Sequence, residues 1–174
     1  MDHSLRMTGT LDPRDGWTAD GCTIAKALDV IPTRSAFLIL REAFYGTTRF
    51  DDFAERVGIS EPVTAARLRE LVENGLLERE DYREPGQRTR QRYRLTQKGA
   101  DLFPALVALM QWGNHWLDDH GGPVELRHRD CGEVVLVELR CAAGHQISPA
   151  TVDLARHGED YLATLPHPIV GVEP

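Results

Sequence analysis

The segment from residue 33 to 96 constrains the fold most, because it is an ordered series of short elements. An apolar helix is followed by a short helix, a tight turn at Gly58 and a second helix that ends at Gly75, and two strand-like runs then flank an arginine-rich stretch. A short helix, a Gly-containing turn and a second amphipathic helix are typical of a motif that inserts one helix into the major groove of DNA. We therefore predict an α+β, mostly helical fold built on a winged helix-turn-helix.

Local signals indicate where the helices begin. A short amphipathic helix is expected over 22–30, and Thr33 is placed to cap a helix over 35–45 whose apolar residues recur at spacings of three and four. The run from Thr48 to Asp51 has the form of a capping box. Ser60 followed by Pro62 is a typical start for the second helix of the motif.

The second helix of the motif is the predicted recognition helix. A turn of 100° per residue places Leu68, Leu71 and Val72 towards the core. Arg67 faces outwards in this projection, whereas Thr64 lies nearer the core face. A solvated helix surface would give the same pattern, but the place of these residues in the motif favours contact with DNA. The residues expected to contact DNA from this helix are Ser60, Pro62, Val63, Thr64, Arg67 and Arg69.

Two strands, 76–82 and 90–95, are predicted to flank a turn at Pro85-Gly86. Arginine alternates with other residues across the second strand, and a period of two would place these arginines on one face. Four like charges on one face repel one another, so an anionic partner explains them better than a solvated strand does. The arginines expected to contact DNA here are Arg88, Arg90 and Arg92, with Arg94 on the same face, and Arg49 is expected to contact a backbone phosphate.

The charge distribution is uneven. The chain has 20 Lys and Arg against 27 Asp and Glu, a net charge of −7. Residues 67–98 nevertheless have nine basic and six acidic residues, and residues 86–98 have five basic residues and no acidic one. Because charge interactions are screened over about 10 Å, the local field decides whether a face attracts DNA. The acidic remainder is expected to orient the basic face towards the duplex.

The segment after the second strand predicts an interface between copies of the chain. A long helix is expected from Thr96 to residue 120, interrupted at Pro104. Its apolar stripe is wide for a helix at the edge of a small domain, and a homodimer seam would explain this width. Apolar space beside such a seam is also where a small-molecule effector would bind. The stripe consists of Leu102, Leu106, Leu109, Trp112 and Trp116.

The two ends of the chain differ from its middle. Residues 1–20 are polar and are expected to be a flexible leader, and residues 121–174 are expected to form an appendage with a strand over 134–139 in a small β-hairpin. His128, Cys131, Cys141 and His145 have a pattern that can bind a tetrahedral zinc ion. A Cys131–Cys141 disulfide is a second alternative. We predict two reduced cysteines, no metal and no cofactor.

Composition argues against several classes of protein. No apolar run approaches the length of about 18 residues that a membrane span needs. Three cysteines and no signal-peptide pattern favour the cytoplasm. We find no nucleophile elbow, phosphate loop or metalloprotease motif, so an enzyme is not predicted. The alternative to a DNA-binding protein is a winged-helix module that binds other proteins.

The chain resembles the HxlR family of bacterial winged helix-turn-helix transcription regulators over about residues 21–118. The resemblance implies a homodimer built through the N- and C-terminal helices of a domain spanning 21–120, and a pseudo-palindromic operator. It also implies that Cys22 corresponds to the cysteine that senses oxidants in some members. The alternative is that Cys22 is simply a small buried apolar residue. Ser35 and Pro62 depart from the family pattern, which has a large aromatic and often a basic residue there. The matching motifs are Cys22-x-Ile24-Ala25-x-Ala27-Leu28, Leu38-Ile39-Leu40-Arg41-Glu42, Gly46-x-x-Arg49-Phe50, Arg67-Leu68-Arg69-Glu70-Leu71, Gly75-Leu76 and Tyr93-x-Leu95-Thr96-x-x-Gly99.

Overall fold

The computed structural model describes residues 4–11, 21–83 and 90–156. These residues fall into two compact units, which are described separately. The first contains residues 21–83 and 90–106, and the second contains residues 4–11 and 107–156. In the described part of the chain, no helix is long and apolar enough to cross a membrane.

Two helices begin the first unit, as the sequence predicts. Helix α1 is Thr23–Val30, and helix α2 is Arg34–Phe44. The side chain of Thr33 accepts a hydrogen bond of 3.1 Å from the amide of Ala36, so the predicted cap of α2 is present. None of the residues of α1 is buried, and Ile24 and Leu28 are 70% and 63% exposed. Helix α1 therefore leaves apolar surface uncovered.

Helices α3, Phe50–Val57, and α4, Glu61–Glu73, form the helix-turn-helix. Gly58 ends α3 in the left-handed conformation, with φ of 70°. The predicted capping box at Thr48 is wrong, because Arg49 is the N-cap residue of α3 and makes no side-chain capping bond. The Thr48 carbonyl instead accepts a hydrogen bond of 2.8 Å from the amide of Tyr93. This tertiary contact moves the start of the helix one residue along the chain.

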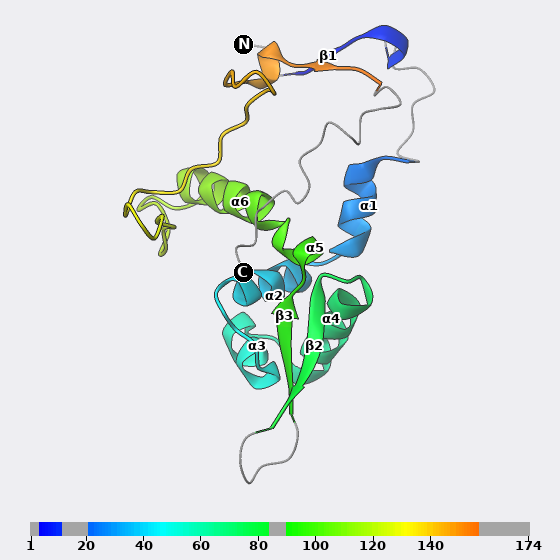
Figure 1. Ribbon diagram of the computed structural model, residues 1–174, viewed down its shortest axis with the longest axis vertical. Helices are drawn as coiled ribbons and strands as arrows, with labels where there is room; N and C mark the ends of the chain where they lie inside the picture. Colours follow the sequence, from blue (N-terminus) through cyan, green and yellow to red (C-terminus); the bar gives the residue numbers. More distant parts are fainter. Residues whose placement is uncertain (1–3, 12–20, 84–89, 157–174) are drawn as a thin grey trace. The chain divides into compact units, whose positions relative to one another are not determined.

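An antiparallel ribbon follows the second helix of the motif. Strands β2, Leu77–Tyr82, and β3, Arg90–Leu95, pair from Leu77 opposite Leu95 to Tyr82 opposite Arg90. Figure 1 shows this ribbon beside α2, α3 and α4. Both strands lie where the sequence predicts them. The segment that joins them, with the predicted turn at Pro85-Gly86 and Arg88, lies outside the described residues.

One apolar core connects these elements. Ile39 and Leu40 of α2, Phe53 of α3 and Leu68 of α4 are almost completely buried. The ring of Tyr93 packs edge-on against Phe53, with 6.2 Å between the ring centroids. Because α4 contributes to this core through one face, its opposite face is fixed in direction relative to the ribbon.

The long helix predicted from Thr96 is two helices. Helix α5 is Gln97–Ala100 and helix α6 is Phe103–Trp116. Thr96 caps α5 by accepting a bond of 3.1 Å from the amide of Gly99. Pro104 lies in the first turn of α6, where the missing amide hydrogen is tolerated, so it does not interrupt the helix. The break at residues 101–102 precedes it.

The second unit contains short elements and turns. Strand β1, Arg6–Met7, pairs in parallel with β4, Asp153–Leu154, and two 3₁₀ turns are Gly9–Leu11 and Pro149–Thr151. Arg6 bonds both carboxylate oxygens of Asp153 at 2.7 Å, and this bond with Arg6 lowers the pKa of Asp153. A strand was expected over 134–139 but does not form. Isolated bridges instead pair Arg127 with Val134 and Arg140 with Gln146.

Candidate nucleic-acid interface

The first turn of α4 is exposed and includes the acidic Glu61. Pro62 and Val63 are exposed, and Arg69 is exposed one turn and a half later. Leu68 and Leu71 are fully buried on the opposite face. The helix therefore has the buried face that the sequence predicts at Leu68 and Leu71 and exposed residues at Pro62, Val63 and Arg69.

Thr64 lies in the interior instead of on this face. Its side chain is completely buried, and its hydroxyl donates to the Ser60 carbonyl at 3.1 Å. The same carbonyl accepts the Thr64 amide at 2.9 Å. Ser60 itself is the N-cap residue but makes no side-chain capping bond. The expectation that Thr64 contacts DNA conflicts with this burial, because a base or phosphate cannot reach its hydroxyl.

Arg67 is half-buried and does not face fully outwards as expected. Its side chain is 24% exposed, and Nη1 lies 2.5 Å from the Glu70 carboxylate, one turn along α4. Within the described residues, Nε of Arg67 is the one buried side-chain polar atom without a hydrogen-bond partner. Glu70 therefore balances the charge of Arg67. Arg69, which immediately precedes Glu70 in the sequence, remains exposed.

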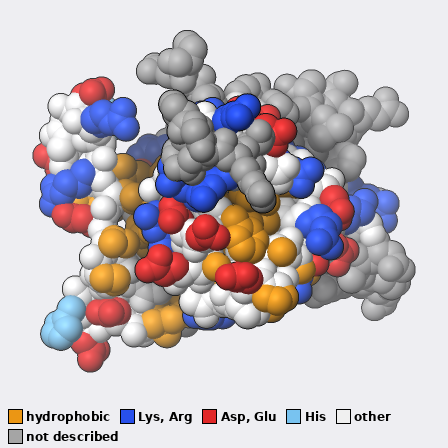
Figure 2. Space-filling model, turned by 90° about the horizontal axis from the view of Figure 1, so that it is seen from below, with side chains coloured by type: hydrophobic (Ala, Val, Ile, Leu, Met, Phe, Trp, Pro, Cys, Tyr) orange, Lys and Arg blue, Asp and Glu red, His pale blue; other side chains and the backbone are white. Residues whose placement is uncertain are grey.

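Acidic residues balance part of the charge on the ribbon. Arg92 Nε lies 2.7 Å from the Glu80 carboxylate, and Arg94 Nε lies 3.1 Å from the same oxygen. The expected repulsion between like charges on β3 is therefore offset by an acidic residue on the paired strand. In Figure 2, Lys and Arg side chains are interspersed with Asp and Glu side chains around an apolar area.

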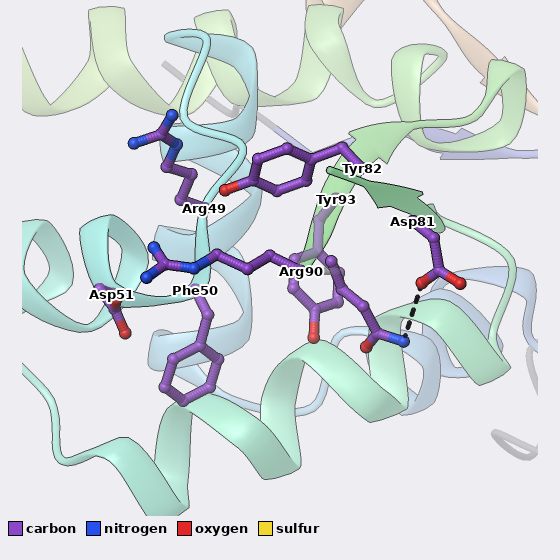
Figure 3. Close-up of a pocket in the computed structure, with 8 residues that line it drawn as sticks. Arg49, Phe50, Asp51, Asp81, Tyr82, Arg90 and Tyr93 are labelled. Atoms are coloured by element: carbon purple, nitrogen blue, oxygen red, sulfur yellow. Dashed lines mark hydrogen bonds between the residues drawn. The ribbon is translucent and has the colours of Figure 1, made fainter. Parts of the chain in front are cut away.

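A cleft opens between the start of α3 and the ribbon. It has a volume of about 590 Å³ (Figure 3). Arg49 and Arg90 reach it from two different elements, and Figure 3 shows the Arg90 side chain extending towards Asp51. Gln91 donates to the Asp81 carboxylate at 3.3 Å on the ribbon side. The lining residues are Arg49, Phe50, Asp51, Asp81, Tyr82, Arg90, Gln91 and Tyr93.

Arg49 is held at both its backbone and its side chain. An isolated bridge pairs its backbone with Arg92. Its guanidinium carbon lies 5.8 Å from the centre of the Tyr82 ring, within the range of a cation–π contact. Tyr82 is not among the residues predicted from the sequence, because a tyrosine that ends a strand is an ordinary feature. The feature that could have identified Tyr82 is its place at the end of the first predicted strand, opposite Arg90.

The three cysteines form no disulfide, and two of them lie beside histidines in the described part of the chain. Cys22 is half-buried immediately before α1. Cys131 Sγ lies 3.3 Å from His128 Nδ1, and Cys141 Sγ lies 3.5 Å from His145 Nδ1, each pair within its own turn. Among the described residues, no three side chains of the kinds that bind metals form a group that could hold an ion.

The elements around the cleft define the class of protein. A helix-turn-helix whose second helix exposes its first turn, followed by a β-ribbon, is a winged helix-turn-helix. A family model described as HxlR-like helix-turn-helix matches residues 30–121, and the chain belongs to this family of transcriptional regulators.

A regulator of the helix-turn-helix type from Mycobacterium bovis, Mb3122, is 43% identical over 135 residues. The match covers 76% of this chain and 84% of that relative. The crystal structure of PA1607, described as a candidate transcription factor, has a TM-score of 0.66 and 39% identity, covering 73% of this chain and 89% of the other. The redox regulator HypR in its reduced form has a TM-score of 0.50 and 27% identity, covering 55% and 94%.

Proposed function

We propose that this chain is a cytoplasmic regulator that binds a pseudo-palindromic operator as a homodimer. Each copy would insert the first turn of α4 into a major groove and place the ribbon against the flanking backbone. The observation that carries this proposal is the exposed first turn of α4, together with a cleft between α3 and the ribbon that two arginines line. Helix insertion with basic flanking contacts is how winged helix-turn-helix proteins bind DNA.

The contacts divide by chemistry. Pro62, Val63 and Arg69 have the exposure needed to reach base edges, and Arg67 would exchange Glu70 for a phosphate or base. Arg49 and Arg90 line the cleft and would contact the backbone. Arg92 is a secondary candidate because Glu80 already pairs with it. Ser60, the N-cap residue of α4, is also a secondary candidate. Phosphate contacts position the protein, whereas contacts with base edges give sequence specificity.

Uncovered apolar side chains support the homodimer. On α6, Trp112 is 54% exposed and Leu109 is exposed to the same extent, and Ile24 and Leu28 of α1 are also exposed. Large exposed apolar side chains on adjacent helical turns are a mark of protein–protein interfaces. Light scattering on the purified chain measures the mass directly, and a monomer at micromolar concentration would contradict this part of the proposal.

A signal would tune the proposed DNA binding. One route is a small effector beside the apolar surface of α6, and the other is oxidation of Cys22. HypR, which is similar to this chain, is described as a redox regulator in its reduced and oxidised forms. Mass spectrometry of the protein after mild oxidant, with Cys22→Ser as the control, tests the second route.

The test of the proposed function is binding to duplex DNA as a function of salt. Each phosphate neutralised makes the fall of log K with log salt steeper by about 0.9 for duplex DNA. We expect affinity to fall steeply between about 50 and 200 mM salt. Affinity that does not change with salt, or no binding at low salt, would instead support the protein-interaction module.

A further inference from the structure

We propose that the cleft binds one phosphate of the DNA backbone between Arg49 and Arg90, and that Tyr82 is the positioning residue that holds Arg49 ready for it. This inference rests on the proposed DNA binding and adds a defined phosphate site to it. Tyr82 does not contact the phosphate in this proposal. It acts through the guanidinium of Arg49 (Figure 3).

Two arginines from separate elements converge on the cleft. Arg49 precedes α3, and Arg90 begins β3, yet both line the same cleft. Guanidinium groups suit phosphate oxygens because their N–H donors lie in one plane and bind in pairs. Two such groups that line one cleft can bind one phosphate together.

Net charge alone does not make this cleft attract an anion. Asp51 and Asp81 line it together with Arg49 and Arg90, so the charges of these four residues cancel. Attraction for a phosphate must then come from where the guanidinium groups lie rather than from their number. Gln91 engages one of the two carboxylates, because its amide donates to Asp81.

Arg49 is fixed in place before any ligand binds. Its backbone is bridged to Arg92, and the neighbouring Thr48 carbonyl accepts the Tyr93 amide at 2.8 Å. An arginine side chain has several rotatable bonds, and ordering them on binding would cost affinity. The Tyr82 ring, 5.8 Å from the Arg49 guanidinium carbon, restricts those rotations before DNA arrives.

Tyr82 is placed for this role by the ribbon. It is the last residue of β2 and lies directly opposite Arg90 in the register, so its backbone position is set by the pairing of the strands. Its side chain is only half-buried. A substitution at this position therefore changes the contact with Arg49 without opening the core around Phe53.

The experiment measures the affinity of the full chain for a short, fluorescein-labelled duplex of mixed sequence over a range of salt concentrations. A mixed sequence suffices because phosphate contacts carry no sequence information. The variants are Tyr82→Leu, Tyr82→Phe, Arg49→Ala and the double variant Tyr82→Leu with Arg49→Ala. Thermal unfolding of each variant shows that it is folded.

We expect Tyr82→Leu to lower affinity by about two- to fivefold, the range that corresponds to an exposed cation–π contact. Tyr82→Phe keeps the ring and should bind as the wild type does. Arg49→Ala should reduce the salt slope by about 0.9, the value for one lost phosphate. In the double variant, the tyrosine substitution should have no further effect, because there is no guanidinium left to hold.

Two different failures are distinguishable. If the wild type binds the duplex and Arg49→Ala weakens it, but Tyr82→Leu binds as the wild type does, the role of Tyr82 is wrong and the proposed function stands. The same conclusion follows if Tyr82→Phe is as weak as Tyr82→Leu, or if the two substitutions weaken binding additively. An unchanged slope for Arg49→Ala overturns the phosphate site. If the folded wild type does not bind duplex DNA at low salt, both this inference and the proposed function are overturned.

Discussion

Glu80 lies directly opposite Arg92 in the ribbon and accepts a hydrogen bond of 2.7 Å from its Nε. The same carboxylate oxygen is 3.1 Å from Nε of Arg94. One acidic residue therefore holds two of the arginines that would face DNA. An exposed pair of this kind contributes little to stability, typically about 0–1 kcal/mol, so its main effect is on the local field.

The first prediction follows from this pairing. Glu80→Gln keeps the shape of the side chain and removes its charge, which releases Arg92 and Arg94 for phosphates. We expect several-fold tighter binding to duplex DNA and a salt slope steeper by about 0.9 for each phosphate gained. Fluorescence anisotropy at several salt concentrations measures both quantities. Weaker binding by Glu80→Gln would mean that Glu80 orients the arginines productively.

The second prediction concerns the core beneath the recognition helix. Leu68 is fully buried, and Leu68→Ala should lower the free energy of unfolding by about 2–5 kcal/mol. Val63, 39% exposed on the same helix, provides the matched control, and Val63→Ala should change stability by less than about 0.5 kcal/mol. Urea unfolding of both variants gives the comparison. Equal losses would show that the two faces of α4 are not divided as described.

The third prediction uses two helical glycines. A Cβ on Gly99 would lie 2.1 Å from the Leu76 carbonyl oxygen, which is a backbone atom. Gly99→Ala should therefore destabilise the protein by about 1–3 kcal/mol or more. A Cβ on Gly113 in α6 would meet no atom of another described element within 4 Å, and Gly113→Ala should stabilise the helix by up to about 1 kcal/mol. Thermal melts of the two variants should shift in opposite directions.

The fourth prediction concerns assembly. Trp112→Glu places a charge in the exposed apolar surface of α6 and should convert the proposed dimer into a monomer in analytical ultracentrifugation. Val63 is also exposed and apolar but lies on α4, so Val63→Glu is the control and should leave the mass unchanged. A dimer that survives Trp112→Glu would exclude this surface as the main interface.

The fifth prediction concerns pH and the pairing of β1 with β4. The hydrogen bond from Arg6 lowers the pKa of Asp153 below its ordinary value of 3.8. A depressed carboxyl pKa means that the pair contributes fully above the ordinary value and is lost as the pH falls through the lowered one. Carboxyl NMR titration should therefore give a lower pKa for Asp153 in the wild type than in Arg6→Gln. Equal values would show that the pair is absent in solution.

Local signals in the sequence predicted much of the first unit. The cap at Thr33, the helix end at Gly58 and the strand boundaries at Tyr82 and Arg90 all depend on neighbouring residues, and the structure confirms them. The helix start at Thr48 was misplaced, and Thr64, which the sequence places nearer the core face, is too deeply buried for the DNA contact expected of it. Tyr93 binds the carbonyl of Thr48, and the first turn of α4 packs Thr64 inwards.

The appendage and the cleft were harder to predict. Residues 134–139 have the composition of a strand, but a strand needs a partner strand. Here the Gln111 side chain instead donates to the Val135 carbonyl at 2.7 Å and accepts from the Val137 amide at 3.0 Å. Arg49 and Tyr82 are far apart in sequence and meet at the cleft only in the folded chain, so the sequence does not show their contact. The neutralisation of Arg92 by Glu80 likewise depends on cross-strand register.

The most direct test of the central claim is footprinting of the purified chain on the DNA upstream of its own gene, with Arg69→Ala in parallel. We predict two protected half-sites related by two-fold symmetry, with centres about 10 base pairs or a multiple of this apart. Arg69→Ala should weaken both half-sites together. Uniform cleavage at low salt by a folded wild-type protein, indistinguishable from the variant, would contradict the claim that this chain is a dimeric reader of DNA sequence.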